Sequence, residues 1–287
     1  MKVLRDAGAM RAWSFEQRAA GRSLGLVPTM GAFHEGHLSL MRASIAREDA
    51  TVVSIFVNPT QFAPHEDFDS YPRTFEADCE QAEALGVDAI YAPAASKMYL
   101  EKYATYVTVE GLQDRLCGIS RQHFFRGVAT VVAKLFNAVT PDRAYFGQKD
   151  AQQCAVIKRM ARDLDFPVEI VTVPTVREPD GLAMSSRNIY LTSDERRAAL
   201  CLSRGLADAA SAWSTGQRDA KALKAAVCDA VDREPLLQLE YVSLANAETM
   251  VELTGTVTGS ALLSLAARAS KARLIDNVVL GSIQSAT

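Results

Sequence analysis

The chain has 287 residues, 48% of them hydrophobic, and a net charge of −3, so one or two domains can bury a sizeable core and the charge gives no reason to expect nucleic-acid binding. No apolar run approaches the roughly 20 residues that span a bilayer, so we expect no membrane contact. Five scattered cysteines and a charged N-terminus without an apolar signal core predict a cytoplasmic protein.

The first part of the chain alternates helical and strand patterns. Residues 6–20 have the pattern of an amphipathic helix that ends at Gly21. A short apolar run at 24–28 predicts a buried strand, and apolar residues recur at helical spacing over about 37–47. The β-branched run at 51–57 predicts a second buried strand.

The same alternation continues through the middle of the chain. In chain order, we expect a helix at 74–85, strands at 88–92 and 103–109, a helix at 127–139, a strand at 144–146, a helix at 152–164 and a strand at 168–173. This order predicts an α/β fold with a doubly wound parallel sheet. Such sheets bind ligands outside the carboxyl ends of their strands. Four loops that carry polar or charged residues meet this condition: 29–37, 58–62, 147–150 and 175–187.

The pattern changes after about residue 175. A turn cluster at 177–181 precedes two long helical patterns, and two strands follow these helices. The expected helices are 193–213 and 219–233, and the expected strands are 239–244 and 261–267. Helices followed by antiparallel strands predict a smaller α+β domain. We therefore divide the chain into domains at 1–176 and 177–287.

The turn at 29–37 contains two histidines, His34 and His37, three residues apart. Gly31 and Gly36 allow the backbone to bend where a strand leads into a helix, and a helix N-terminus attracts anions such as phosphate. The pair has three interpretations: exposed histidines in a tight turn, a zinc site, or a nucleotide site. Zinc is disfavoured because the spacing is one residue short of H-E-x-x-H and no third ligand is evident. The pair resembles the HxGH signature of nucleotidylyl transferases and class I aminoacyl-tRNA synthetases, whose imidazoles donate to ATP phosphates.

Cationic and hydroxyl side chains lie in two other loops on the same predicted edge. Lys149 and Arg187, taken singly, would be ordinary surface residues. Together they could neutralise a triphosphate whose α–β bond is breaking, because preorganised positive charge is usually the largest catalytic effect. Ser185 and Ser186 add hydroxyl donors, and their loop could close over the leaving pyrophosphate.

Two glutamines, Gln61 and Gln153, are predicted near this edge. Either one alone would most simply be a surface residue. As neutral amides that donate and accept, they could orient a substrate that bears hydroxyls and a carboxylate.

The motifs together closely resemble the pantothenate synthetase (pantoate–β-alanine ligase) family. They are PTMGAFHEGH, FVNPTQF, PDRAYFGQKDAQQ, VPTVREPDGLAMSSRNIYL and ARLIDN, in the family's order and over nearly the whole chain. The resemblance implies a Rossmann-like domain of the nucleotidyltransferase kind with a smaller C-terminal lid. It also implies an ATP-dependent condensation of (R)-pantoate with β-alanine through a pantoyl adenylate, releasing pyrophosphate, AMP and pantothenate. Magnesium would arrive with ATP, and the protein would be a homodimer.

The resemblance assigns roles to individual residues. His37 would be the proton donor and His34 its companion, and the catalytic set would be completed by Lys149, Ser185, Ser186 and Arg187. ATP would be bound by Met30, Gly31, Ala32, Phe33, His34, Glu35, Gly36, His37, Gly147, Gln148, Lys149, Asp150, Val176, Met184, Ser185, Ser186 and Arg187. Gln61 and Gln153 would bind pantoate, and Gln61 would also contact β-alanine. Asp78 and Gln81 are candidates for the surroundings of the magnesium ion, whose ligands stay unassigned.

The chain departs from the family pattern at two places. Gln148 stands where the family commonly has glutamate, and the altered loop at 121–128 leaves the role of His123 open. Two alternative functions also stay open. One is another nucleotidyltransferase of this fold, whose phosphorylated acceptor would require additional arginine or lysine. The other is a nucleotide-binding regulatory protein without turnover.

Overall fold

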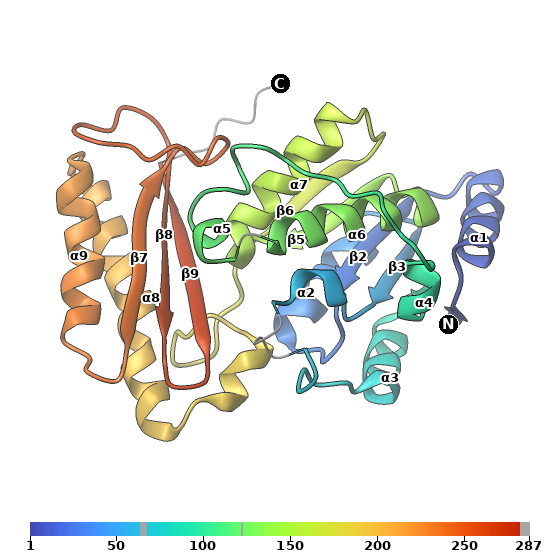
Figure 1. The fold of residues 1–287 in the computed structure, drawn as a ribbon, viewed down its shortest axis with the longest axis horizontal. Helices are drawn as coiled ribbons and strands as arrows, with labels where there is room; N and C mark the ends of the chain where they lie inside the picture. The colour runs from blue at the N-terminus through green and yellow to red at the C-terminus, as the bar shows by residue number, and fades with distance from the viewer. Residues whose placement is uncertain (64–67, 122, 282–287) are drawn as a thin grey trace.

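A six-stranded parallel sheet and a three-stranded antiparallel sheet organise the chain in the computed structural model, which describes residues 1–63, 68–121 and 123–281 (Figure 1). The predicted α/β fold class, with a smaller second sheet, is confirmed. Gln122, in the altered 121–128 loop, lies outside the described residues. The helices in the described part of the chain are all too short or too polar to cross a bilayer.

The order of the large sheet determines where a ligand can bind. Every neighbouring pair is parallel, and the order is β1 (Lys2–Leu4), β4 (Ala89–Tyr91), β3 (Ala50–Ile55), β2 (Leu24–Thr29), β5 (Arg143–Gly147) and β6 (Glu169–Val173). From β2 the chain proceeds outward through β3 and β4, and it then returns to place β5 and β6 on the other side of β2. The connections therefore diverge between β2 and β5, and a crevice opens at the carboxyl ends of these two strands.

Helices cover both faces of the large sheet. One face packs against α1 (Ala7–Ala19), α6 (Phe124–Val139) and α7 (Ala151–Asp163), and the other against α2 (Glu35–Ile45) and α3 (Phe75–Leu85). Helix α6 buries most of its circumference because it contacts α1 and α7 as well as the sheet. The short helices are α4 (Ala95–Met98), α5 (Cys117–Ser120), η1 (Pro59–Gln61), η2 (Gln148–Asp150) and η3 (Ser186–Tyr190).

The C-terminal part consists of two helices and an antiparallel sheet. Its elements are α8 (Ser193–Ser214), α9 (Ala220–Asp232), β7 (Gln238–Ala245), β8 (Ala261–Arg268) and β9 (Arg273–Leu280). The helices share one core with the sheet, whereas Leu262 and Ile275 pack against the core of the large domain. Figure 1 accordingly shows the small sheet between these helices and the large domain. We propose that the two domains are 1–176 and 177–287.

The prediction of a strand at 103–109 was wrong. The segment pairs with no strand in the described chain, and Val107 N–H instead donates to Thr130 Oγ1 of α6 (3.0 Å). The Tyr103 ring packs under Lys134, with 4.9 Å from Nζ to the ring centroid. The alternating pattern therefore reflects packing against a helix. Conversely, strands β1 and β9 and the short helices α4 and α5 were not predicted.

Candidate active site

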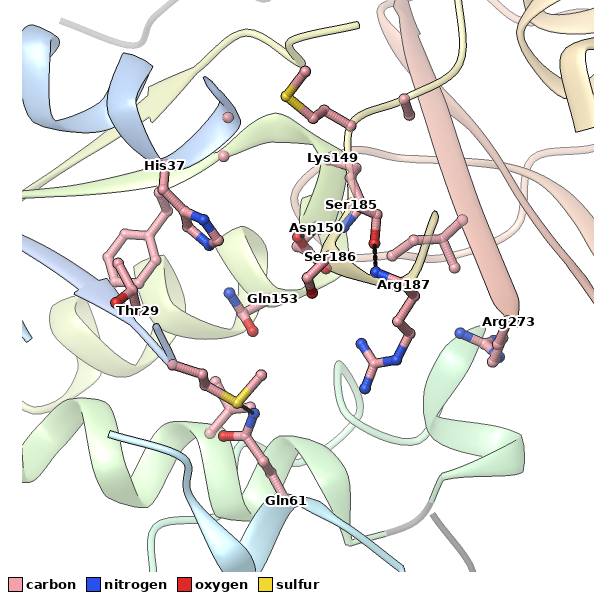
Figure 2. Close-up of a pocket in the computed structure, with 18 of the residues that line it drawn as sticks. Thr29, His37, Gln61, Lys149, Asp150, Gln153, Ser185, Ser186, Arg187 and Arg273 are labelled. Atoms are coloured by element: carbon pink, nitrogen blue, oxygen red, sulfur yellow. Dashed lines mark hydrogen bonds and ion pairs between the residues drawn. The ribbon is translucent and has the colours of Figure 1, made fainter. Parts of the chain in front are cut away.

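A cleft of about 660 Å³ lies at the carboxyl ends of β2 and β5 and extends to the C-terminal domain. Its volume is in the range of small-molecule sites. All four predicted loops contribute to its lining, and Figure 2 shows His37, Lys149 and Arg187 around one cavity. The predicted residues that line it are Met30, His34, Gly36, His37, Gln61, Gly147, Lys149, Asp150, Gln153, Val176, Met184, Ser185, Ser186 and Arg187.

A buried carboxylate holds the turn between β2 and α2. Asp78 of α3 is 1% exposed, and it accepts hydrogen bonds from the N–H groups of Ala32 (2.9 Å) and Phe33 (2.8 Å). Gly31 has φ +84°, and a Cβ there would lie 2.9 Å from Asp78 Oδ2, so the turn requires glycine. We expected Asp78 and Gln81 near magnesium, but neither lines the cleft, and the oxygens of Asp78 instead hold the backbone.

The two histidines cap the N-terminus of α2. Nδ1 of His34 accepts the Gly36 N–H (3.1 Å), and Nδ1 of His37 accepts the His34 N–H (3.3 Å), an arrangement that resembles a capping box. Their rings stack with centroids 4.1 Å apart. Because each Nδ1 accepts a hydrogen bond, the proton of each neutral ring is on Nε2. Both histidines can therefore donate from Nε2 while the N-terminus of α2 stays capped.

Burial determines the charge state of these rings. Burial, together with the nearby His34 and Lys149, lowers the pKa of His37 to about 3. Burial and the Lys149 ammonium together lower the pKa of His34 to about 4. Both imidazoles are therefore neutral donors near pH 7, so they can approach Lys149 without charge repulsion.

Five predicted ATP-binding residues have no part in the lining: Gly31, Ala32, Phe33, Glu35 and Gln148. Glu35 pairs with Arg42 on the exposed side of α2. The ring of Phe33 packs against His37 at a centroid distance of 5.7 Å. Gln148 hydrogen-bonds Asn277 of β9. Each of these five residues lies within two positions in the chain of a residue that lines the cleft.

The loop at 183–188 forms the opposite wall of the cleft. Ser185 Oγ accepts the Arg187 N–H (3.3 Å), and Met184 N–H donates to the Val176 carbonyl (3.0 Å). The Asn188 amide anchors the base of the loop through Glu178 Oε1 (2.6 Å). In Figure 2, both serines and Arg187 lie at the cavity, and Arg187 extends into it. The loop is thus fixed at its base while its hydroxyl and guanidinium groups reach the cavity.

A chain of hydrogen bonds orients Gln61. The Tyr99 hydroxyl donates to Asn58 Oδ1 (2.8 Å), and Asn58 Nδ2 donates to Gln61 Oε1 (3.1 Å). Burial raises the pKa of Tyr99 to about 12, so its hydroxyl stays a donor at neutral pH. The Gln61 carboxamide therefore directs Nε2 toward Met30 Sδ (3.1 Å) and the cleft. The Gln153 carboxamide points into the cavity in Figure 2 and hydrogen-bonds no other described residue.

Several lining residues were not predicted. Asn58 and Tyr71 are buried among them, and Asn58 stands in the FVNPTQF motif already noted. The charged residues lining the cleft, counted over the described part of the chain, are six cations and two carboxylates: Arg121, Lys149, Arg187, Arg268, Lys271, Arg273, Asp150 and Asp276. This excess favours anionic ligands. The described residues form no cluster of three or more His, Cys, Asp or Glu that could hold a metal ion.

The fold and the cleft define a Rossmann-like α/β protein of the nucleotide-binding class, with paired imidazoles and cations at the switch point of the sheet. The Pantoate-beta-alanine ligase family matches residues 2–279. The pantothenate synthetase of Pelotomaculum thermopropionicum is 54% identical over 283 residues, covering 99% of this chain and 100% of the relative. That of Moorella thermoacetica is 54% identical over 280 residues, covering 98% and 99%.

Solved structures agree with these sequence matches. The pantothenate synthetase of Thermus thermophilus has a TM-score of 0.90 at 42% identity, covering 97% of this chain and 99% of that one. The pantoate-beta-alanine ligase of Francisella tularensis, complexed with beta-gamma ATP and beta-alanine, has a TM-score of 0.78 at 29% identity and covers 97% of both. The chain belongs to the pantoate-beta-alanine ligase family.

Proposed function

We propose that this protein is an AMP-forming ligase that joins (R)-pantoate to β-alanine through a pantoyl adenylate. The main support is that two neutral histidines, two cations and two glutamine amides, from the four predicted loops and the first turn of α7, line one cleft. Membership of the pantoate-beta-alanine ligase family supports the choice of substrates.

In the first step, a pantoate carboxylate oxygen attacks the α-phosphorus of ATP. A new O–P bond forms, the α–β phosphoanhydride bond breaks, and pyrophosphate leaves with the bonding electrons. His34 and His37 would donate Nε2–H bonds to the phosphates, and Lys149 and Arg187 would neutralise the charge that moves onto pyrophosphate. Ser185 and Ser186 would add hydroxyl donors to the same group.

Neutral amides suit the nucleophile of this step. Gln61 and Gln153 would hold the pantoate carboxylate and hydroxyl without a direct ion pair. A carboxylate paired with a cation would be a poorer nucleophile, because its charge would be stabilised in the ground state more than in the transition state. The position of Gln61 is fixed by Asn58, so its donor is preorganised.

In the second step, the amine of β-alanine attacks the acyl carbon of the adenylate. A C–N bond forms, the acyl–phosphate C–O bond breaks, and AMP leaves, while the amine loses a proton. Gln61 would contact β-alanine. The walls at Tyr71 and 183–188 would protect the adenylate from water, with the Tyr71 hydroxyl 3.4 Å from Ser186 Oγ.

Three further features belong to the same proposal. Magnesium would arrive with ATP, and the phosphates would supply most of its oxygen ligands. Val176 would contact adenine through its backbone, beside the Gly147–Asp150 turn. The protein would be a cytoplasmic homodimer, as the sequence resemblance implies.

A pyrophosphate-release assay with purified protein tests the function. We expect release only when ATP and pantoate are both present, and continued AMP formation only after β-alanine is added. Equal amounts of AMP and pantothenate should then form. Formation of ADP, turnover without pantoate, or transfer of the nucleotide to a phosphorylated acceptor would contradict the proposal. The last result would indicate another nucleotidyltransferase.

A further inference from the structure

Strand β9 of the C-terminal domain contacts the turn that carries Lys149. The side chain of Asn277, which is 5% exposed, donates from Nδ2 to the carbonyl oxygens of Gln148 (2.9 Å) and Lys149 (3.0 Å). In return, Gln148 Nε2 donates to Asn277 Oδ1 (2.9 Å). One asparagine thus holds two consecutive carbonyls on the opposite domain.

Asp276 and Arg177 in turn hold Asn277 in position. The Asn277 backbone N–H donates to Asp276 Oδ1 (2.8 Å), and Asp276 is 3% exposed. Arg177 binds both oxygens of Asp276, at 2.6 and 3.0 Å. A bidentate pair of this kind fixes direction as well as distance. A continuous series of contacts therefore connects the segment after β6 with the Lys149 turn.

The Lys149 turn has few local supports. Helix η2 is only three residues long, and neither η2 nor the start of α7 has a side-chain cap among the described residues. Such short 3₁₀ turns have poor hydrogen-bond geometry and are marginal alone. Within the described chain, Lys149 has an ion pair only with the adjacent Asp150, at 3.3 Å. The contacts from β9 therefore supply much of what fixes the direction of Lys149.

We propose that Asn277 is a positioning residue for the adenylation step. Asn277 holds Lys149 in place to contact the phosphates only when the two domains are in contact. This inference rests on the proposed function. Separation of β9 from η2 would break three hydrogen bonds and release the turn. Lys149 would then lose its preorganised position, and charge stabilisation depends on that position.

Gln148 has a defined part in this contact. Because Nδ2 of Asn277 already serves two carbonyls, its Oδ1 must face residue 148 and needs a donor there. A glutamine supplies that donor, whereas a glutamate would present a second acceptor to Oδ1. Gln148 thus adds a hydrogen bond between the domains.

Two substitutions test the proposal in the full-length protein. Asn277→Asp replaces the amide that donates to two carbonyls with an acceptor, and Gln148→Met removes the donor without adding charge. The matched control is Asn246→Asp in the same domain. The hydrogen bonds that the Asn246 carboxamide makes in the described chain are accepted by Oδ1, from Glu248 N–H (3.0 Å), Thr249 N–H (2.9 Å) and Thr249 Oγ1 (3.1 Å), and aspartate can accept them too. All variants are first checked for unchanged thermal unfolding and circular dichroism.

The two half-reactions are then measured separately by single turnover. We expect Asn277→Asp to slow pyrophosphate formation by about tenfold or more, because misplacement of a catalytic group by about 1 Å can cost ~10² in rate. Gln148→Met should slow it less. Attack of β-alanine on preformed pantoyl adenylate should change by less than about twofold in every variant. The Asn246→Asp control should match wild type in both steps.

A double-mutant cycle with Lys149→Ala tests whether Asn277 acts through Lys149. If it does, Asn277→Asp should add less than about twofold to the loss caused by Lys149→Ala. Losses that multiply, or equal slowing of both half-reactions, would overturn the inference. If Asn277→Asp alone fails to fold, Gln148→Met provides the same cycle. Failure of wild type to form pyrophosphate from ATP and pantoate would instead refute the proposed function.

Discussion

His34 and His37 combine an observed structural role with the chemical role that we propose for them, within four residues. Each Nδ1 accepts a backbone N–H at the N-terminus of α2, and each Nε2 is left for the cleft. Asparagine is a good N-cap residue, and glutamine at the third helical position can complete a capping box. The two roles can therefore be separated by substitution.

We predict that the double substitution His34→Asn and His37→Gln preserves the fold and removes the reaction. Stability at neutral pH should stay within about 1 kcal/mol of wild type, because the caps are replaced. Pyrophosphate release should fall by about 10²-fold or more, because both ring donors are lost. Chemical denaturation and the release assay measure the two effects. A protein that unfolds at neutral pH would show that the capping role had been misjudged.

The low histidine pKa values also predict how stability depends on pH. Unfolded histidine has a pKa near 6.5, whereas His34 and His37 in the folded protein have values of about 4 and 3. Below about pH 6.5 the unfolded state therefore binds more protons, so the free energy of unfolding decreases as the pH falls. The neighbouring charges at His34 are Lys149, Asp150 and Glu178.

Denaturant unfolding at a series of pH values measures this effect. Between about pH 6.5 and 5, the stability of wild type should decrease more steeply than that of the His34→Asn and His37→Gln double variant. Above about pH 6.5 the two curves should run parallel. Equal slopes throughout would mean that the two rings are protonated in the folded protein as readily as in the unfolded chain.

At the level of elements, the close approach of α6 to η1 determines where Gln61 lies. A Cβ at Gly127 would lie 2.5 Å from the Thr60 carbonyl oxygen and 2.9 Å from the Gln61 nitrogen. The Gly127 carbonyl also accepts from Asn58 Nδ2 (3.1 Å). The helix and the loop can approach this closely only because residue 127 has no side chain.

Gly127→Ala should therefore displace the Gln61 loop. We predict a loss of about 1–3 kcal/mol in stability, as for other overpacked sites. The KM for pantoate should rise more than the KM for ATP, because Gln61 is proposed to bind pantoate. Steady-state kinetics with each substrate varied in turn measures this. Gly259→Ala is the control, since a Cβ there meets no atom within 4 Å and should change neither quantity.

Elements with strong local periodicity were predictable from the sequence. Helix α7 and strand β3 agree with their predicted ranges to within a residue or two, because their apolar patterns continue through the whole element. Short elements with one sheet neighbour were missed, as at β1, which pairs only with β4 within the described chain. The false strand at 103–109 shows the opposite error, since alternation can also arise from packing against α6.

The location of the site was predictable because topology determines it. Parallel strands place their carboxyl-end loops on one edge, so His37, Lys149 and Gln61 had to be neighbours once the sheet was recognised. The contact of Asn277 with the Lys149 turn was not predictable, since it joins residues 128 positions apart. The ARLIDN motif was noted, but nothing in its spacing indicates its partner.

For the whole molecule, charge is distributed unevenly. The chain carries −3 overall, yet six cations and two carboxylates are among the described residues that line the cleft. Lys271, in the turn between β8 and β9, is an exposed cation of this lining. A positive cleft in a negative molecule should attract anionic substrates such as ATP and pantoate.

We predict that kcat/KM for ATP falls as ionic strength rises, and that Lys271→Ala lowers both this value and its salt dependence. The loss should be about two- to tenfold at low salt and should nearly vanish once the Debye length falls to about 3 Å. Steady-state kinetics with ATP varied across a salt series measures the effect. The control is Lys221→Ala on α9, an exposed lysine outside the cleft, which should leave the slope unchanged.

The carboxylate of Asp78 has a practical consequence for handling the protein. The turn between β2 and α2 is held to α3 because the N–H groups of Ala32 and Phe33 donate to Asp78. The shape of this turn therefore needs no bridging ion. Treatment with a chelator should therefore remove only the magnesium that is bound to ATP. The activity of the protein should return in full when fresh magnesium–ATP complex is supplied.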